Sequence, residues 1–170
     1  PIVRSNAVQA LDDADSLLSE KGYRPEIVFF DLPGTLKSDG VIKTLSQMDY
    51  IFTPVSADRF VVESALQFVM MFNDNLVTTG LAKTKAISLF WTMVDGREKT
   101  GLYDLYGKLF AENNFRVLDT RLPDSKRFRR EPSDDRKSVF RSTILPPDTS
   151  MLKGSRIREL SEEICSIING

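Results

Sequence analysis

The chain has 170 residues, 41% hydrophobic and 28% charged, with 23 basic and 24 acidic side chains and a formal net charge of −1. This composition is typical of one globular domain, and the balanced charge excludes a global cationic field for nucleic acid. The chain has no histidine and one cysteine, which excludes Ser-His-Asp and Cys-His catalytic pairs, imidazole zinc sites and an intrachain disulfide. No apolar run approaches the roughly 18 residues that a membrane span needs.

The start of the chain and its single cysteine indicate the cellular compartment of the protein and whether the chain is part of a longer one. A lone cysteine and the lack of a signal-peptide pattern favour a cytoplasmic protein. The chain begins Pro1-Ile2-Val3, without methionine. We therefore expect a fragment or a processed product of a longer protein.

The first third of the chain predicts a helix, a strand and a second helix. Apolar residues at helical spacing predict a helix over 5–21, with Ser5 as its N-cap and Gly22 as its stop. The continuous run EIVFFD at 26–31 predicts a strand buried on both faces, as in parallel sheets. Helical spacing returns over 41–48 after a stretch of turn residues.

Strand and helix patterns alternate through the rest of the chain. The predicted strands are 50–55, 85–94 and 116–122. The predicted helices are 58–79, 102–113 and 155–169. This alternation predicts a single α/β domain over residues 1–170, with a mostly parallel sheet between helices on both faces, in three layers.

Ligands of open parallel sheets bind beyond the carboxyl ends of the strands. Asp31 follows four apolar residues of a predicted strand, and a carboxylate at that edge suits a magnesium ion or its bound water. Pro33 and Gly34 form a turn whose glycine N–H can approach an anion. The alternative is a plain turn, in which Asp31 bonds the backbone that follows it. The same rule makes candidates of the loops 31–40, 55–60, 92–101 and 122–133.

Four segments in a fixed order carry a family resemblance. EIVFFDLPGT at 26–35 is an apolar strand that ends in Asp-x-Pro-Gly, and DYIFTPV at 49–55 is a second apolar strand. WTMVDGR at 91–97 and the proline-bearing stretch 121–133 follow. Together they resemble the ParA/MinD/Soj family of deviant Walker-A P-loop ATPases, over about residues 24–168. The similarity is closest to the ParA-like proteins of plasmids and conjugative elements.

The resemblance implies ATP and magnesium as cofactors of the full-length protein, and a role for each matching residue. Asp31 would be the catalytic Walker-B-type acid, which holds magnesium through water. Pro33 and Gly34 would lie in the switch that senses the γ-phosphate. The residues around the nucleotide base would be Thr92, Asp95, Pro123 and Asp124.

The chain departs from the family at its start, because the glycine-rich K-G-G-x-G-K-[ST] phosphate loop is absent from the sequence. In the family that loop precedes the Asp31-type strand, and its own strand lies between the counterparts of 26–31 and 50–55. We therefore expect the C-terminal part of a longer ATPase, which alone neither binds ATP tightly nor hydrolyses it. Without the phosphate-loop strand, the sheet would have either a gap or a re-paired arrangement with exposed edges. Exposed edges favour a homodimer or a swapped self-association.

The densest positive cluster consists of Lys126, Arg127, Arg129 and Arg130. One interpretation is a solvated surface helix. The other, which the resemblance favours, is a patch that contacts the phosphates of nonspecific DNA with an affinity that falls as salt rises.

As a whole, the resemblance implies an ATPase that acts in partition, maintenance or transfer of a plasmid or mobile element. It would work through ATP-dependent dimerisation, nonspecific DNA binding and a partition-type partner protein. Two alternatives stay open: a non-catalytic protein-interaction module of degenerate P-loop ancestry, and an unrelated nucleotide- or flavin-binding α/β domain. A glycine-lysine loop upstream of Pro1 would favour the ATPase, and a strand order incompatible with a P-loop sheet would favour the unrelated domain.

Overall fold

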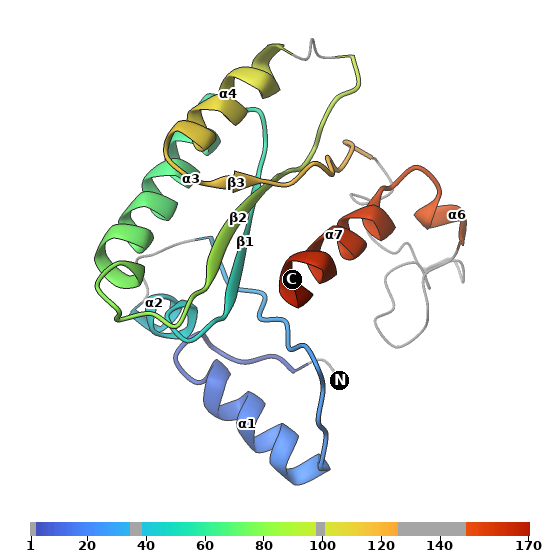
Figure 1. Ribbon diagram of the computed structural model, residues 1–170. Helices are drawn as coiled ribbons and strands as arrows, with labels where there is room; N and C mark the ends of the chain where they lie inside the picture. The colour runs from blue at the N-terminus through green and yellow to red at the C-terminus, as the bar shows by residue number, and fades with distance from the viewer. Residues whose placement is uncertain (1–2, 35–38, 98–100, 126–148) are drawn as a thin grey trace.

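A computed structural model describes residues 3–34, 39–97, 101–125 and 149–170 (Figure 1). Its centre is a parallel sheet of three strands in the order β1-β2-β3. The strands are β1 (Tyr50–Val55), β2 (Ala86–Trp91) and β3 (Arg116–Val117). β1 and β2 pair along their whole length, from Tyr50 opposite Ala86 to Val55 opposite Trp91. This arrangement confirms the predicted α/β class.

Helices cover both faces of the sheet (Figure 1). α3 (Arg59–Phe72) and α4 (Gly101–Glu112) lie on one face. α7 (Ile157–Asn169) lies on the other face, where the Tyr50 hydroxyl donates a hydrogen bond of 3.3 Å to the carbonyl of Ile168. The three layers therefore match the predicted architecture in this part of the chain.

The remaining helices are shorter or lie beside the sheet. They are α1 (Ala10–Lys21), α2 (Asp39–Leu45), a π-helical turn that continues α3 (Asn73–Val77), and α6 (Thr149–Leu152). None of the helices in the described part of the chain has the length and apolarity to cross a lipid bilayer.

Trp91, at the end of β2, lies at the centre of the core between the sheet and the helices α3 and α4. Its side chain is 2% exposed and meets the ring of Tyr103 edge-on, with the ring centres 5.2 Å apart. Tyr106 and Phe110 flank the same indole at 6.4 and 6.1 Å. These aromatic contacts fix α4 against the carboxyl end of β2.

The two ends of α1 test the predicted capping residues. Gly22 ends α1 as predicted, with a left-handed φ of 62° that favours glycine. Ser5 is not the N-cap: the chain forms a turn in which the Asn6 side chain accepts the N–H of Gln9, and the helix begins only after Gln9. The Ser5 hydroxyl instead donates to the carboxylate of Asp13.

The predicted strand at 26–31 is wrong. Residues 26–34 pair with no strand in the described part of the chain, and Val28 and Phe29 are 45% and 73% exposed. A strand is stabilised by the backbone of a neighbouring strand, and no described strand lies on the side of β1 that faces this segment across a hollow. The apolar pattern of the segment is therefore present without the pairing that would bury it.

The predicted strand 116–122 is cut to two residues by a bulge. The N–H of Leu118 donates to the carbonyl of Leu89 at 2.8 Å, and the next bond to β2 runs from the N–H of Leu122 to the carbonyl of Trp91, also at 2.8 Å. Four steps along this segment thus match two steps along β2, so two extra residues leave the ladder. β2 also ends three residues earlier than predicted, because Met93 has a left-handed φ of 53° that turns the chain.

Phe110→Ala should lower the free energy of unfolding by about 3–5 kcal/mol, because Phe110 is fully buried against Trp91. Phe60→Ala is the matched control, since Phe60 is 76% exposed and its loss should cost within about 0.5 kcal/mol. Urea unfolding followed by the fluorescence of Trp91, the single tryptophan, measures both. Equal losses for the two variants would contradict the assignment of the core.

Candidate functional site

The loops after β1 and β2 and the segment 122–124 meet at one edge of the sheet. The N–H of Thr92 donates to the carbonyl of Val55 at 2.8 Å, which joins the ends of the two strands. Val94 and Pro123 form a parallel bridge, in which the N–H of Asp124 donates to the carbonyl of Val94 at 2.9 Å. The structure thus brings Thr92, Pro123 and Asp124 together, as the rule for parallel strands predicts.

Asp95 lies in the same loop, and its carboxylate is held by Arg97. It accepts hydrogen bonds from the backbone N–H of Arg97 at 2.9 Å and from its Nε at 3.2 Å. The backbone bond, followed by the side-chain bond, lowers the pKa of Asp95 below its ordinary value. Asp95 therefore stays ionised and shapes the turn after β2.

A hollow of about 1630 Å³ lies along the free edge of β1. The segment 26–34 forms one wall and residues 50–54 of β1 form the opposite wall, while α1, α2, α3 and α7 contribute the remaining side chains. The hollow is larger than the roughly 300–1,000 Å³ of a pocket for a small molecule. Its position fits the expected gap between 26–31 and 50–55.

Asp31, Pro33 and Gly34 line this hollow together with Thr53 and Pro54. The sequence predicts that Asp31 stands at the end of a paired strand. In the structure Asp31 instead belongs to the segment 26–34, which has no strand partner among the described residues. Its carboxylate is exposed, and no cation among the described residues pairs with it. It is therefore free to accept hydrogen bonds from the water molecules of a bound magnesium ion.

The turn at Gly34 does not form a phosphate cradle by itself. Nothing lies within 4 Å of the place where a Cβ would be on Gly34, whereas a close backbone cradle crowds that position. The N-terminus of α3 is occupied as well, because the Asp58 carboxylate accepts the N–H groups of Phe60 and Val61 at 2.9 and 3.1 Å. Neither the turn at Gly34 nor the N-terminus of α3 thus offers free N–H groups arranged to hold phosphates.

No group of three or more Asp, Glu or Cys side chains that could hold a metal occurs within the described ranges. A water-mediated magnesium contact by Asp31 needs no such group, so this assignment stays a prediction. The basic cluster Lys126, Arg127, Arg129 and Arg130 lies outside the described residues.

Glu163 on α7 holds the backbone that leads to the carboxyl edge of the sheet, and the sequence did not indicate this role. Its two carboxylate oxygens accept the N–H groups of Asp119 at 2.7 Å and Thr120 at 2.9 Å, which are the extra residues of the bulge before the carboxyl edge. Burial raises the pKa of Glu163, but hydrogen bonds from the Thr120 side chain and from both N–H groups outweigh it and lower the pKa below 4.5. No local motif links residues more than 40 positions apart, so no signal in the sequence pointed to this contact.

No protein-family model matches the chain, and no curated protein matches it. The family resemblance therefore depends on the four sequence segments alone.

Glu163→Gln should lower the free energy of unfolding by about 1–2 kcal/mol at pH 7, because an amide accepts hydrogen bonds on only one oxygen. The lowered pKa makes this stabilisation complete above about pH 4.5, and it is lost as the pH falls through the folded-state value. The difference from the wild type should therefore shrink in urea titrations at pH 3. Glu162→Gln, at the exposed neighbouring position, is the control; an equal loss there would contradict the bridging role of Glu163.

Proposed function

We propose that the chain is the C-terminal part of a cytoplasmic ParA-like P-loop ATPase. The full-length protein would act in partition, maintenance or transfer of a plasmid or mobile element. It would do so through ATP-dependent dimerisation, nonspecific DNA binding and a partition-type partner.

The hollow beside β1 carries this proposal. The resemblance puts the family's phosphate-loop strand between the segments 26–31 and 50–55, and the hollow lies between these segments. β1, which borders the hollow, is an edge strand of the described three-stranded sheet, as expected when that strand is missing. The geometry therefore agrees with an expectation that came from the sequence motifs.

The carboxyl edge of the sheet supports the proposal further. The loops that carry Thr92 and Asp95 are joined to the segment with Pro123 and Asp124 by the bridge at Val94. Open parallel sheets bind nucleotides at this edge. These residues would contact the base, and Asp31 would contact the magnesium ion through water.

The proposal assigns no hydrolysis to the 170-residue chain alone. Magnesium and lysine side chains on the phosphates provide most of the electrostatic stabilisation in phosphoryl transfer, and Asp31 would supply only part of it, through the water on the magnesium ion. The phosphates need backbone N–H groups, which neither the turn at Gly34 nor the N-terminus of α3 offers. ATP and magnesium therefore belong to the full-length protein.

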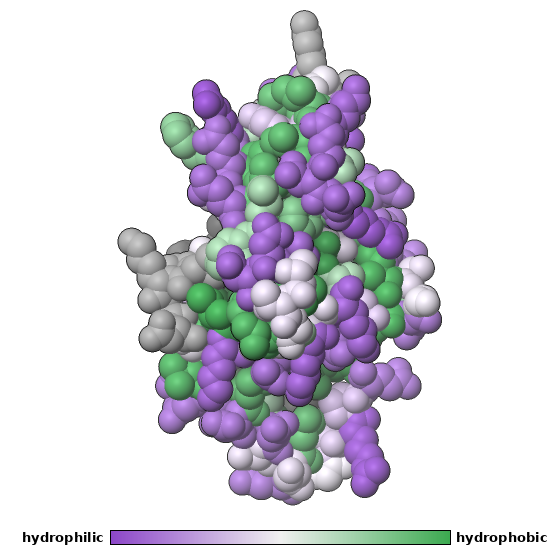
Figure 2. All heavy atoms as spheres, turned by 60° about the vertical axis from the view of Figure 1, so that its left-hand side comes forward, coloured by the Kyte–Doolittle hydropathy of each residue, from purple (hydrophilic) through white to green (hydrophobic). Residues whose placement is uncertain are grey.

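A second candidate function is a non-catalytic module that binds another protein. Apolar side chains that line the hollow are exposed, notably Phe29 and Phe60. Figure 2, in which the side of α3 and α4 is turned forward, shows apolar side chains at the surface between hydrophilic ones. Exposed apolar groups gathered along one hollow, as Phe29 and Phe60 are, are typical of interaction surfaces.

Asp31→Asn in the full-length protein should lower the ATPase kcat on the order of 100-fold, because it removes the negative charge that would hold the water ligands of the magnesium ion. Asp15→Asn is the control, since Asp15 lines the same hollow from α1 and has no part in the proposed magnesium contact. Steady-state phosphate release measures both. Undiminished hydrolysis in Asp31→Asn, or micromolar binding of MgATP by the 170-residue chain in calorimetry, would refute the proposal.

Arg129→Glu combined with Arg130→Glu should abolish the gel shift of nonspecific DNA by the full-length protein, because phosphate contacts dominate such binding. The matched control is Arg156→Glu with Arg158→Glu, which reverses two exposed charges at the start of α7. Unchanged DNA binding in the first double variant would dismiss the basic cluster as the DNA surface.

A further inference from the structure

The free edge of β1 presents backbone groups that lack a strand partner. The carbonyls of Asp49 and Val55 accept the N–H groups of Lys85 and Thr92, at 2.7 and 2.8 Å, on the side of β2. Alternate residues of a strand turn their backbone to opposite sides. The even-numbered residues of β1 therefore turn theirs toward the hollow, and β1 is the last strand on that side of the described sheet.

The hydrogen-bonding groups of the β1 backbone on this edge indicate which kind of ligand can bind there. Tyr50 and Phe52 each offer one N–H and one carbonyl, whereas Pro54 offers only a carbonyl. Unpaired strand edges of this kind are templates for another strand.

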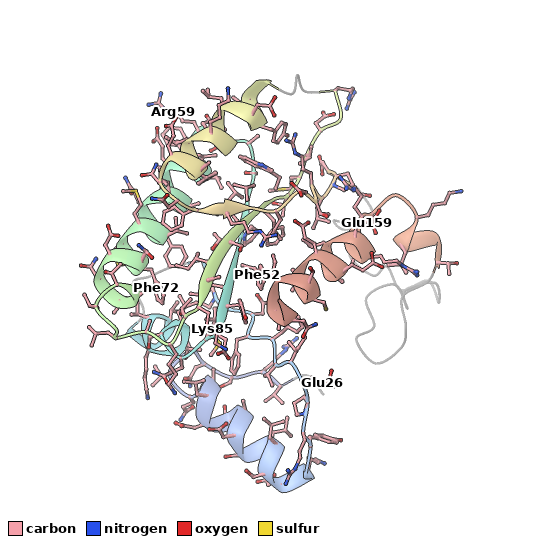
Figure 3. All side chains as sticks on the ribbon, in the orientation of Figure 1. Glu26, Phe52, Arg59, Phe72, Lys85 and Glu159 are labelled. Carbon is pink, nitrogen blue, oxygen red and sulfur yellow. The ribbon has the colours of Figure 1, made fainter. Side chains whose placement is uncertain are left out.

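Helices cover this edge on both faces of the sheet. α3 lines the hollow with Val61 and Phe68, which are seven residues apart on one face of the helix. α7 lines it with Ile164 and Ile168 on the other face of the sheet, where Phe52 also points (Figure 3). We call the space between 27–30, β1 and these two helices the slot. A slot with apolar side chains above and below and a free backbone edge at its side is the environment of an interior strand.

The rim of the slot is acidic. Glu26, labelled in Figure 3, and Asp31 stand at the two ends of the apolar wall 27–30, and Asp15 adds a third carboxylate from α1. None of the three has a cationic partner within the described ranges. Lys85 also lines the hollow but pairs with Asp49 at 3.0 Å. An occupant with basic groups at both ends would complement these charges.

We propose that the slot of the 170-residue chain binds an extended apolar segment of another polypeptide, flanked by lysine or arginine, as an added strand beside β1. The backbone of Phe52 forms the central hydrogen bonds, and α3 and α7 enclose the side chains of the added strand. The rim carboxylates of Glu26 and Asp31 attract its basic ends. This inference concerns the 170-residue chain and needs no nucleotide, whereas in the proposed full-length ATPase the phosphate-loop strand would fill the same slot.

The test uses a fluorescein-labelled peptide, Lys-Lys-Val-Thr-Val-Ile-Val-Lys-Lys, and fluorescence anisotropy with the 170-residue chain. Peptide binding is expected to weaken at least about 10-fold when alternate backbone nitrogens are methylated, because two or more hydrogen bonds to β1 are lost. Glutamate in place of the four lysines should weaken it by about the same factor at low salt. No binding of the parent peptide, or equal binding of the methylated one, would overturn the proposal.

Ser64→Trp tests the location, because Ser64 lines the hollow from α3 and a larger side chain fills the slot. It should weaken peptide binding at least about 10-fold, whereas Ser16→Trp, at an exposed position of α1 outside the hollow, should leave binding unchanged. Equal effects of the two variants would overturn the proposal. If Ser64→Trp does not fold, the methylated peptide still decides.

Hydrogen exchange distinguishes the other possible occupants. The N–H of Phe52 should exchange slowly only when the peptide is present. Slow exchange without peptide would mean that the segment 26–31 closes onto β1 itself, and a dimer of the chain that Ser64→Trp abolishes would mean that a second copy fills the slot. Either result would overturn the assignment of a partner strand.

Discussion

Among the described residues, β1 is hydrogen-bonded to a strand along one side only, and the rest of this structure depends on that one-sided pairing. On the paired side, six residues in register with β2 hold the sheet, and the helices α3, α4 and α7 pack on its two faces. On the free side, the segment 26–34 has the apolar residues of a buried strand but no backbone to bind, so Val28 and Phe29 stay at the surface. The hollow, the exposed rings and the isolated Asp31 carboxylate all follow from this missing pairing.

A second important interaction is the one between Glu163 and the backbone of residues 119–120. The Glu163 carboxylate accepts hydrogen bonds from the backbone N–H groups of Asp119 and Thr120, which lie outside the β2–β3 ladder. These hydrogen bonds replace the ones that a neighbouring strand would otherwise provide. They stabilise the bulge at 119–120, after which the chain returns to β2 at Leu122 and reaches the bridge between Val94 and Pro123. The position of the carboxyl edge, where the candidate nucleotide residues gather, is thus coupled to the opposite face of the sheet through α7.

The two functional interpretations concern the same hollow. A strand that carried a phosphate loop would complete both the sheet and a nucleotide site next to Asp31, whereas a strand without such a loop would complete only the sheet. The chemistry of the chain supplies the carboxylate and the carboxyl edge, but its own N–H groups at α3 are bound by Asp58. What enters the hollow therefore decides whether this fold acts on a nucleotide or binds a protein.

The sequence by itself determined the features that depend on short-range patterns. Helical spacing indicated α3, α4 and α7, β-branched and aromatic runs indicated β1 and β2, and their alternation indicated a parallel sheet with Thr92, Asp95 and Pro123 at one edge. Only the tertiary structure decided that 26–31 is not a strand, that 118–122 bulges, and that Glu163 holds the bulge. The physical reason is that an apolar run becomes a strand only when another backbone lies beside it, and the partners of these backbone groups are far away in the sequence.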